Sequence, residues 1–534
     1  MQLILPFFYP IVGDDAWVHL NWIEQFTRLF REGHYYPRML SQGFWGFGSP
    51  AFYFYPPLTF WCAGILSFII PTADTIYSTL QLIGTLLSFF TFYLYLRCFK
   101  LPSPAMVIGA TIYALHPYRI LDLYVRSVLS EQFSFIFIPL ILLGIELAMK
   151  ETSMEKRKIV KAIVISVIGW VGLLLTNVPI AIIIGYTAPF YFLLRTSRTT
   201  YKIGFVSTLF AGMIAVFMAS TYLLPAIHYS ASIKMAHLWD AQEFSGNIMD
   251  AITGVMGSEQ RYLKTGLVLI YTFGLILLAV ARTLKVGIKS QAIYRVIFLL
   301  TVVPLVVQLP FLDRILQNHL PFVNYVQFGY RWNVLLVCST ALLVALSFEG
   351  IENKVATYLG YSSLMIGSVI CFGFLLSVYP HGWKYHRTTE HIDAPEYLPA
   401  NSLPNVQEEL RLLKLHASDP FIISDSGDTH ISVISHAHDK TEFGSDGALR
   451  SAITFHLAYF ESWKLINSRG EGIVLMSDSI GRMKTILPNK QDIYTLQVVS
   501  SSAETIGKIL TTVGLSLFVI CLVLTIFWRS PKVF

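Results

Sequence analysis

Long apolar runs separated by short polar loops fill most of the chain up to residue 378. A membrane-spanning helix needs about 20 predominantly apolar residues, so runs of this kind predict membrane spans. Residues 2–12 form only a short or incomplete first span, unless the true start of the chain lies upstream. The pattern predicts an α-helical polytopic membrane protein with about 11–12 spans. The expected full-length spans are 76–96, 103–116, 132–149, 159–176, 179–194, 203–222, 265–284, 292–310, 332–348, 357–378 and 506–528.

The short apolar run at 58–70 decides the topology. Prolines at 56–57 and 71 flank it, and if it crossed the membrane the basic loops would fall on both sides. If it lies in the interface as a juxtamembrane helix, every basic loop falls on one side, as the positive-inside rule requires. We therefore expect both termini to be cytoplasmic, together with the basic segments 97–100, 150–161, 195–202, 282–295, 354 and 529–532. The outer face would carry 13–75, 117–131, 223–264, 311–331 and 379–505.

Residues 379–505 follow a different pattern, in which short alternating segments are bounded by turns rich in Gly, Ser, Asp and Asn. Such segments are typical of strands, and the expected strands are 421–424, 430–435, 452–460, 472–476 and 492–499. We therefore expect three parts. They are a transmembrane module at 1–378 with its first outer loop at 13–75, an all-β, sandwich-like extracytoplasmic domain at 379–505, and a final transmembrane helix with a short cytoplasmic tail at 506–534.

The composition agrees with this division and excludes several classes of protein. The chain is 54% hydrophobic and 13% charged, with a mean hydropathy of +0.57, which is typical of a polytopic membrane protein. The net charge of +6 is small and comes from clusters in short loops, so it indicates topology rather than a nucleic-acid partner. The five cysteines lie in or beside apolar segments, and we expect neither disulfides nor a cysteine zinc site.

Two adjacent carboxylates, Asp14 and Asp15, open the first outer loop, and His19 follows one helical turn after Asp15. An Asp at the start of a helix is often an N-cap, which contributes about 1 kcal/mol. A second carboxylate and a histidine on the same helix face favour a chemical role instead. The group would then act as a general base or would bind a hard cation such as Mg²⁺ or Mn²⁺. The N-cap alternative stays open.

Two further outer segments carry charge beside apolar spans. The stretch 116–133 contains Arg126 and Glu131, and the stretch 323–333 places Arg331 at the start of a span. Interfacial anchoring by Tyr and Arg, or snorkelling of Arg331, would explain both segments without a function. The functional alternative places Glu131 across a cleft from the acidic pair. It gives Arg331 a phosphate ligand, for which a guanidinium fork is suited.

Two weaker candidates lie in loop 223–264 and in the β domain. The loop is long enough to cover a site, and its Lys234 is another candidate cation, although an ordinary loop is the simpler interpretation. His436 and His438 alternate and would face the same side of a strand, and Asp439 follows them. Because no third ligand is evident nearby, the pattern does not predict a metal site there.

The Asp-bearing first outer loop with its juxtamembrane helices, the second acidic position and the outer tail domain resemble the GT-C superfamily. These integral-membrane glycosyltransferases use lipid-linked sugars. More closely, the chain resembles the bacterial membrane family labelled 6-pyruvoyl-tetrahydropterin synthase-related, although nothing in it looks like a soluble pterin-forming enzyme with zinc histidines. The stretches that carry this resemblance are YYPRMLSQGFWGFGSPAFYFYPPL (35–58), PYRILDLYVRSVLSEQF (117–133), VQFGYRW (326–332), EYLPA (396–400) and YFESWKLINSRGEG (459–472).

The resemblance implies a role for each matching position. Asp15, or else Asp14, looks like the catalytic carboxylate, Glu131 looks like the second acidic position, and Arg331 looks like the cation near the lipid phosphate. Asp15 and Glu131 are also candidate ligands of a divalent metal, Mg²⁺ or Mn²⁺, which would be the cofactor if there is one. The other candidates for substrate or phosphate binding are Arg126, His19, Lys234 and Tyr330.

These residues predict a glycosyltransferase of the bacterial inner membrane. It would move a sugar from a polyprenyl-phosphate-linked donor to a glycan, lipid or protein acceptor, with Asp15 as base and Arg331 on the phosphate. Direct displacement predicts inversion at the anomeric carbon. Two departures from the family pattern, Gly-Tyr at 329–330 and Asn177 in place of a His, keep a catalytically silent scaffold of an envelope-polysaccharide machine as an alternative. A transporter is disfavoured because the spans are nearly free of charged residues.

Overall fold

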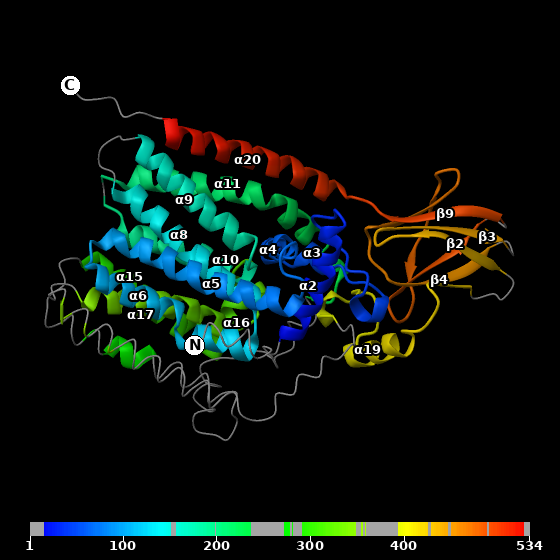
Figure 1. The fold of residues 1–534 in the computed structure, drawn as a ribbon, viewed down its shortest axis with the longest axis horizontal. Helices are drawn as coiled ribbons and strands as arrows, with labels where there is room; N and C mark the ends of the chain where they lie inside the picture. Colours follow the sequence, from blue (N-terminus) through cyan, green and yellow to red (C-terminus); the bar gives the residue numbers. More distant parts are fainter. Residues whose placement is uncertain are drawn as a thin grey trace, which may run out of the picture.

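A bundle of long helices and a β domain lie at opposite ends of the molecule, with the short helices of the first outer loop between them (Figure 1). The expected spans 265–284 and 357–378 fall mostly outside the described residues, as do the first span and Asp14. The computed structural model describes residues 15–150, 156–197, 199–235, 272–277, 280, 291–348, 354–355, 358, 362, 393–424, 429–446, 450–488 and 491–527.

Most of the apolar runs fold as the long helices that their length predicts. The described helices of the bundle are α5 (Ala73–Leu96), α6 (Ser103–Ala114), α8 (Leu129–Lys150), α9 (Lys156–Leu174), α10 (Val178–Arg195), α11 (Tyr201–His228), α15 (Gln291–Val307), α16 (Pro310–His319), α17 (Asn333–Ser347) and α20 (Ser502–Phe527). Within the described residues, six helices are long and apolar enough to cross a membrane. They are Ala73–Phe99, Leu129–Met149, Val178–Arg195, Tyr201–Ser232, Gly329–Ser347 and Ser502–Phe527.

Two expected spans are shorter than predicted. At 1.5 Å per residue, α6 with its 12 residues is about 18 Å long, while the apolar core of a bilayer is about 30 Å thick. The run at 103–116 is therefore not a full-length helix by itself. α15 is apolar but likewise falls short of 18 residues.

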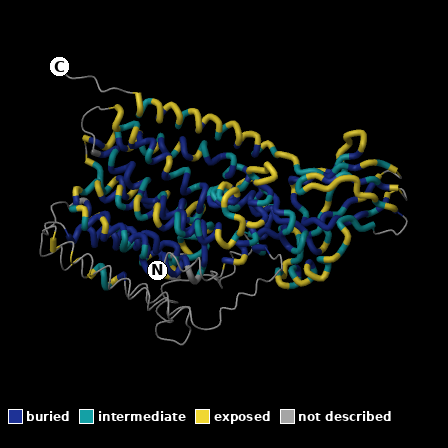
Figure 2. Tube along the Cα trace, in the orientation of Figure 1, coloured by how far each residue is buried: buried dark blue, intermediate teal, exposed yellow. Residues whose placement is uncertain are grey.

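The outer faces of the long helices are apolar and exposed, as expected for surfaces that face lipid. Figure 2 shows α20 as a largely exposed helix along one side of the bundle, and only 11% of its most apolar window is buried. Two of its glycines allow close packing on α11. A Cβ on Gly507 would lie 2.6 Å from the Ser220 carbonyl oxygen, and one on Gly514 would lie 2.7 Å from the Met218 nitrogen. Small residues at such positions are typical of helix pairs in membranes.

The first outer loop folds into three helices, α2 (Ala16–Arg31), α3 (Ala51–Phe54) and α4 (Leu58–Leu66). α2 is amphipathic and buries Trp22, Phe26 and neighbouring apolar residues against the aromatic rings of Phe52 and Phe60. With nine residues, α4 is about 14 Å long and too short to cross a bilayer. Its length agrees with the prediction that 58–70 lies in the interface.

The β domain consists of two antiparallel sheets that face each other. Their strand orders are β1-β4-β8-β7 and β2-β3-β9-β5-β6. Phe443 of the second sheet contacts Phe455 of the first, with ring centroids 5.7 Å apart, and both rings are buried. The strands are β1 (Ile422–Ser424), β2 (His430–His436), β3 (Lys440–Asp446), β4 (Ser451–Ala458), β5 (Trp463–Asn467), β6 (Gly472–Ile473), β7 (Met476–Ser477), β8 (Arg482–Leu487) and β9 (Gln491–Val498).

The expected strands at 421–424, 430–435, 452–460 and 492–499 correspond to β1, β2, β4 and β9, and the one expected at 472–476 is divided between β6 and β7. The prediction that the region is all-β was wrong for α19 (Val406–Leu415), an amphipathic helix capped by Asn405. β3, β5 and β8 were not predicted. Each of them carries charged residues at exposed or partly exposed positions, which weakens the apolar signal.

The first outer loop and the β domain share one hydrophobic core. The His456 ring of β4 stacks on Phe47 with centroids 3.8 Å apart, and the Ala458 N–H donates to the Phe47 carbonyl oxygen at 2.7 Å. Segment 393–400 adds a second link, because Asp393 accepts a hydrogen bond from Trp22 of α2 at 2.7 Å. The β domain is therefore held against the first outer loop rather than attached through a flexible linker.

Candidate functional site

An unusual turn places the charged residues of 116–131 at one end of the bundle. α7 (Pro117–Leu121) continues into a π-helical turn, η3 (Asp122–Arg126), and Ser127 then adopts a left-handed backbone with φ 59°. α8 begins two residues later, so Arg126 precedes the helix and Glu131 lies in its first turn. π-turns are rare and are frequent at functional sites, because they change the direction of the side chains that follow.

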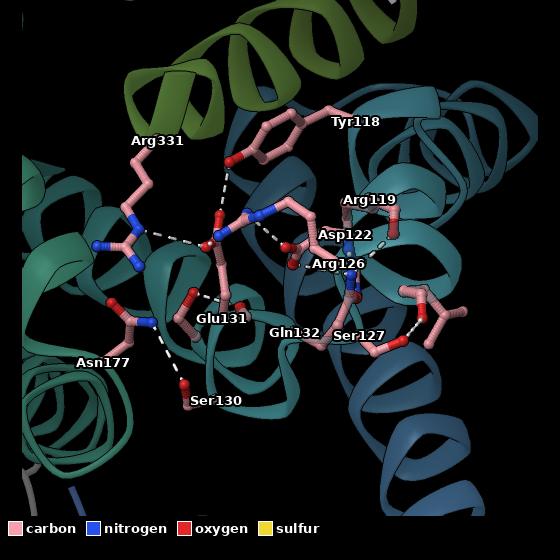
Figure 3. A network of polar contacts seen from close by, with 12 residues as sticks. Tyr118, Arg119, Asp122, Arg126, Ser127, Ser130, Glu131, Gln132, Asn177 and Arg331 are labelled. Atoms are coloured by element: carbon pink, nitrogen blue, oxygen red, sulfur yellow. Dashed lines mark hydrogen bonds and ion pairs between the residues drawn. The ribbon is translucent and has the colours of Figure 1, made fainter. Parts of the chain in front are cut away.

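Glu131 is completely buried and is surrounded by hydrogen-bond donors (Figure 3). Tyr118 Oη donates to Oε1 at 2.5 Å, and Arg126 Nη1 donates to Oε2 at 3.0 Å. The same Arg126 nitrogen donates to Asp122 Oδ1 at 2.7 Å. Burial raises the pKa of Asp122, and the negative charge of Glu131 adds to that shift. A buried carboxylate without such partners would be very costly, so the donors explain how Glu131 is tolerated there.

Arg331 approaches the same carboxylate from a different part of the chain. It lies in η7 (Gly329–Trp332), and its Nε is 3.7 Å from Glu131 Oε2. Its Nη1 donates to the Val326 carbonyl oxygen at 2.8 Å and to Gln327 Oε1 at 2.5 Å, while its buried Nε has no hydrogen-bond partner among the described residues. The predicted proximity of Glu131 and Arg331 is present in the structure. Arg331 is held mainly by its own loop.

The aromatic ring of Tyr330 packs against the guanidinium group of Arg126. The Arg126 Cζ is 4.6 Å from the centroid of the Tyr330 ring, and Phe328 stacks on that ring with centroids 5.1 Å apart. Cation–π contacts of this kind hold a guanidinium without consuming its N–H donors. The aromatic residues of 326–332 therefore position Arg126 as well as Arg331.

Asp15 lies next to this cluster at the start of α2. Its N–H donates to the Arg126 carbonyl oxygen at 2.9 Å, which ties the first outer loop to the π-turn. The residue is exposed, and its side chain makes no capping hydrogen bond to α2. The N-cap explanation for this carboxylate is therefore not supported, and Asp15 remains a candidate for chemistry at the edge of the Arg126 turn.

Glu396 is a further carboxylate of the site that the sequence reasoning did not single out. It lies in η8 (Pro395–Tyr397) and is only partly exposed. Burial raises its pKa to about 7, and the nearby charges of Asp15 and Asp393 add to the shift, while its own backbone N–H and Arg331 oppose it. The EYLPA stretch at 396–400 was the available signal, but the sequence gave no reason to bring it close to Asp15.

His19 is not placed for phosphate binding. It is 2% exposed, and its ring lies among Trp22, Tyr55, Phe60 and Tyr77 at centroid distances of 5.8–6.4 Å. Burial lowers its pKa to about 3. A neutral imidazole enclosed by aromatic rings supports packing of α2, so the prediction that His19 binds substrate or phosphate is not supported.

Lys234 is also engaged by partners other than the residues of the guanidinium cluster. It is buried, and its Nζ donates to Glu409 Oε2 of α19 and to the Leu403 carbonyl oxygen. Its backbone N–H donates to the Leu398 carbonyl oxygen at 2.9 Å. These contacts attach the end of the α11 loop to the β domain, so the predicted phosphate contact by Lys234 is not supported.

Glu131 does not fit the metal-ligand role that the sequence suggested. Both of its oxygens accept hydrogen bonds from protein donors, and two guanidinium groups lie beside it. A Mg²⁺ or Mn²⁺ ion there would have to compete with two fixed positive charges, and Mg²⁺ also requires near-octahedral oxygen coordination. The residues at this position fit an anion better than a divalent cation.

Comparisons with known proteins identify no family for the chain. No protein-family model matches it, and no curated protein matches it. Among solved structures, the chain is similar to the arabinofuranosyltransferase AftD from mycobacteria, with a TM-score of 0.46 and 14% sequence identity. The match covers 71% of this chain and 26% of AftD, so the chain spans about a quarter of that protein's length. A likeness at this level does not identify an activity.

Proposed function

We propose that the protein is a membrane glycosyltransferase that moves a sugar from a polyprenyl-phosphate-linked donor to an extracytoplasmic acceptor. One observation carries the proposal. Two guanidinium groups, Arg126 and Arg331, converge on a buried glutamate at one end of a bundle of apolar helices, beside the start of the first outer loop. A lipid phosphate needs a cationic site at the boundary of an apolar region, and this cluster offers one.

The two arginines would bind the phosphate of the donor. The side chain of Arg331 is 10% exposed and that of Arg126 is 16% exposed, so both are largely shielded from bulk water but keep some accessible surface. Charge-assisted hydrogen bonds to phosphate are stronger in such surroundings than in water. In this scheme Glu131 positions the two guanidinium groups and does not contact the acceptor, which revises the role that its acidity alone suggested.

The acceptor hydroxyl needs a base, and the site offers two carboxylates. Asp15 is the proposed base, since it is exposed at the edge of the cluster, and Glu396 is the second carboxylate of the same site. The base removes the hydroxyl proton, the acceptor oxygen bonds to the anomeric carbon, and the polyprenyl phosphate leaves with the electrons of the broken C–O bond. Attack opposite the leaving group inverts the anomeric carbon. The arginines stabilise the negative charge that develops on the phosphate.

We place the site and the β domain on the extracytoplasmic face of a bacterial inner membrane, with both termini in the cytoplasm. The support is that basic residues gather at the other end of the helices. Arg195 closes α10, and Arg157 near the start of α9 donates to the Thr525 carbonyl oxygen near the end of α20. This asymmetry agrees with the positive-inside rule. Single cysteines at Ser197 and Ser432 would react with a membrane-impermeant thiol reagent from opposite sides of the membrane.

A catalytically silent scaffold is the second candidate, and one observation favours it. Glu131 is fully occupied by Tyr118 and Arg126, and Arg331 is bonded to its own loop, so the cluster is largely satisfied within the protein. A buried ionic network of this kind can also serve the fold alone.

The test measures binding of a polyprenyl monophosphate to the full-length protein in nanodiscs by native mass spectrometry. One charge-assisted hydrogen bond contributes about 1.5–3 kcal/mol, so we expect Arg331→Gln to weaken binding about 10- to 100-fold. Arg195→Gln is the matched control, because Arg195 is also paired with a buried glutamate, Glu146, but at the opposite end of the bundle. Equal affinity in Arg331→Gln and Arg195→Gln would reject the phosphate site. Binding without sugar transfer from any of a panel of polyprenyl-phosphate sugars would favour the scaffold.

A further inference from the structure

The tip of the β2–β3 hairpin lies against the end of α2, although more than 400 positions separate them in the sequence. His34 follows α2, and His438 and Asp439 form the hairpin turn between β2 and β3. One ligand atom from each of these three residues can be chosen so that all lie within 4.8 Å of one another. The two imidazole rings are in contact, with centroids 4.0 Å apart.

Backbone hydrogen bonds fix the His34 side of this cluster. α2 ends at Arg31, and Gly33 then takes φ +97°, a conformation that a residue with a Cβ rarely adopts. The Gly33 N–H donates to the Phe30 carbonyl oxygen at 3.1 Å, and the His34 N–H donates to the Leu29 carbonyl oxygen at 3.0 Å. This pair of bonds is the Schellman arrangement. It determines where the His34 side chain leaves the helix.

Backbone hydrogen bonds also hold the hairpin turn that carries His438 and Asp439. The Ala437 N–H donates to the Lys440 carbonyl oxygen at 2.7 Å and closes the turn. The Val498 N–H of β9 donates to the Asp439 carbonyl oxygen at 2.9 Å, so the neighbouring strand holds the turn in place. Both halves of the cluster are therefore ordered by main-chain contacts that do not depend on the imidazoles meeting.

We propose that His34, His438 and Asp439 form a binding site for a divalent transition metal of the zinc class, which joins the first outer loop to the β domain. Two imidazoles and one carboxylate are a typical zinc donor set, whereas Mg²⁺ and Ca²⁺ prefer oxygen ligands. Zinc at about 2.0–2.1 Å from each ligand holds tetrahedral donor atoms about 3.4 Å apart. The ligand atoms lie within 4.8 Å of one another here and would move closer together when the metal binds. Glu32, the C-cap residue of α2, lies within electrostatic range of His438 and is a candidate for a fourth ligand.

The partner of His438 in this site is not the residue that alternation in the strand suggested. His436 is exposed on β2, and its Nδ1 is bonded to the Thr441 hydroxyl at 2.8 Å. The third ligand is His34, which comes from the other end of the sequence. The proposed site is separate from the guanidinium cluster and does not depend on the proposed function.

Cobalt titration of the full-length protein in detergent tests the proposal, because tetrahedral Co²⁺ absorbs visible light and replaces zinc at such sites. We expect one equivalent of Co²⁺ to give a d–d band that Zn²⁺ displaces. His34→Ala and His438→Ala are each expected to abolish the band. His430→Ala is the matched control, since His430 is an exposed histidine on the same strand β2 and should leave the band unchanged. A band that persists in the His34→Ala/His438→Ala double variant would overturn the site.

Thermal unfolding provides the second measurement and excludes misfolding as an explanation. A ligand that binds only the folded state raises the melting temperature in proportion to the logarithm of its concentration. We expect Zn²⁺ to do so for the wild type and for His430→Ala but not for His34→Gln, which keeps a polar side chain of similar reach. If all three proteins fold and none responds to Zn²⁺, the two imidazoles form only a ring contact and the proposal is wrong. Glu32→Gln is expected to lower Zn²⁺ affinity about 10-fold or more while stoichiometry stays at one, since even the loss of a group that only supports the metal ligands has an effect of this size.

Discussion

Replacing Asp393 with asparagine tests how segment 393–400 is held against the first outer loop. Asp393 is completely buried, and its Oδ1 accepts hydrogen bonds from Trp22 Nε1 and from the Ala394 N–H, both at 2.7 Å. Burial raises its pKa to about 6 from the ordinary value of 3.8, although these donors oppose the shift. Asparagine keeps an oxygen in the same position and removes the titrating group. The substitution therefore isolates the cost of the buried charge.

The size of the effect follows from the two pKa values. Below about pH 4 the carboxyl is protonated in both the folded and the unfolded protein. Between about pH 4 and 6 the unfolded chain loses the proton while the folded protein keeps it, so stability falls as the pH rises. The difference of 6 − 3.8 is 2.2 pKa units, and at 1.36 kcal/mol per unit the loss is about 3 kcal/mol, complete just above pH 6. Asp393→Asn carries no such loss.

The assay is thermal unfolding of the full-length protein in detergent, followed by tryptophan fluorescence between pH 4 and pH 8. Relative to the wild type, we expect Asp393→Asn to become more stable by about 3 kcal/mol as the pH rises across this window. Asp446→Asn is the control, because Asp446 is exposed at the end of β3 and its difference from the wild type should stay constant. A difference for Asp393→Asn that is constant, or that falls as the pH rises, would refute the reasoning.

Three further predictions concern the site and the packing around it. Burial raises the pKa of Glu396 to about 7, so we expect kcat/KM for sugar transfer by the wild type to rise as the pH passes through 7. Glu396→Gln is expected to remove that rise, and an unchanged pH profile in this variant would exclude Glu396 from the reaction. Lys234→Met leaves the buried Glu409 carboxylate without its cation and is expected to lower the free energy of unfolding by about 3–5 kcal/mol. The double variant Lys234→Met/Glu409→Leu should recover most of this loss, and equal losses in both variants would contradict the ion pair between Lys234 and Glu409. In Gly514→Ala the new methyl would lie 2.7 Å from the Met218 nitrogen, so we expect a loss of about 1–3 kcal/mol as α20 moves away from α11; unchanged stability would show that α20 adjusts freely.

The sequence predicted the long helices well, for a simple physical reason. A run of about 20 apolar residues cannot be stable in water and must satisfy its backbone internally in lipid, so α5, α8, α10, α11 and α20 could be predicted from length and hydropathy alone. The same rule cannot detect short elements. α6 was extended too far, and α19 was missed because a ten-residue amphipathic helix resembles alternating strands in a turn-rich region.

The charged residues of the site could be predicted from the sequence, but the residues that they contact could not. Glu131 and Arg331 stand out because charges at the ends of apolar spans are costly and need a reason. Sequence could not show that Lys234 already has a buried partner, nor that His19 faces aromatic rings, since both facts depend on packing between distant segments. Glu396 was hidden for the same reason, because its raised pKa follows from burial that no local pattern reports.

The chain contains a second buried glutamate–arginine pair, and the comparison with it bears on which cluster is functional. Glu146, near the other end of α8, accepts from Arg195 Nε at 2.6 Å and Nη2 at 2.8 Å and from Tyr191 Oη at 2.6 Å. In that pair the Arg195 guanidinium makes two parallel hydrogen bonds to the two oxygens of the Glu146 carboxylate. Such a bidentate pair balances its own charges and needs no further ligand. At the first cluster, two guanidinium groups share Glu131, and Arg331 reaches it only at 3.7 Å without a hydrogen bond. Asp122 Oδ1 also accepts from Arg126 at 2.7 Å, but burial raises the pKa of this carboxyl and so favours its uncharged form. Positive charge therefore exceeds what Glu131 alone can match. An anion that bridges Arg126 and Arg331 would complete the cluster, which is why we assign the phosphate to this end of α8 and a structural role to the other.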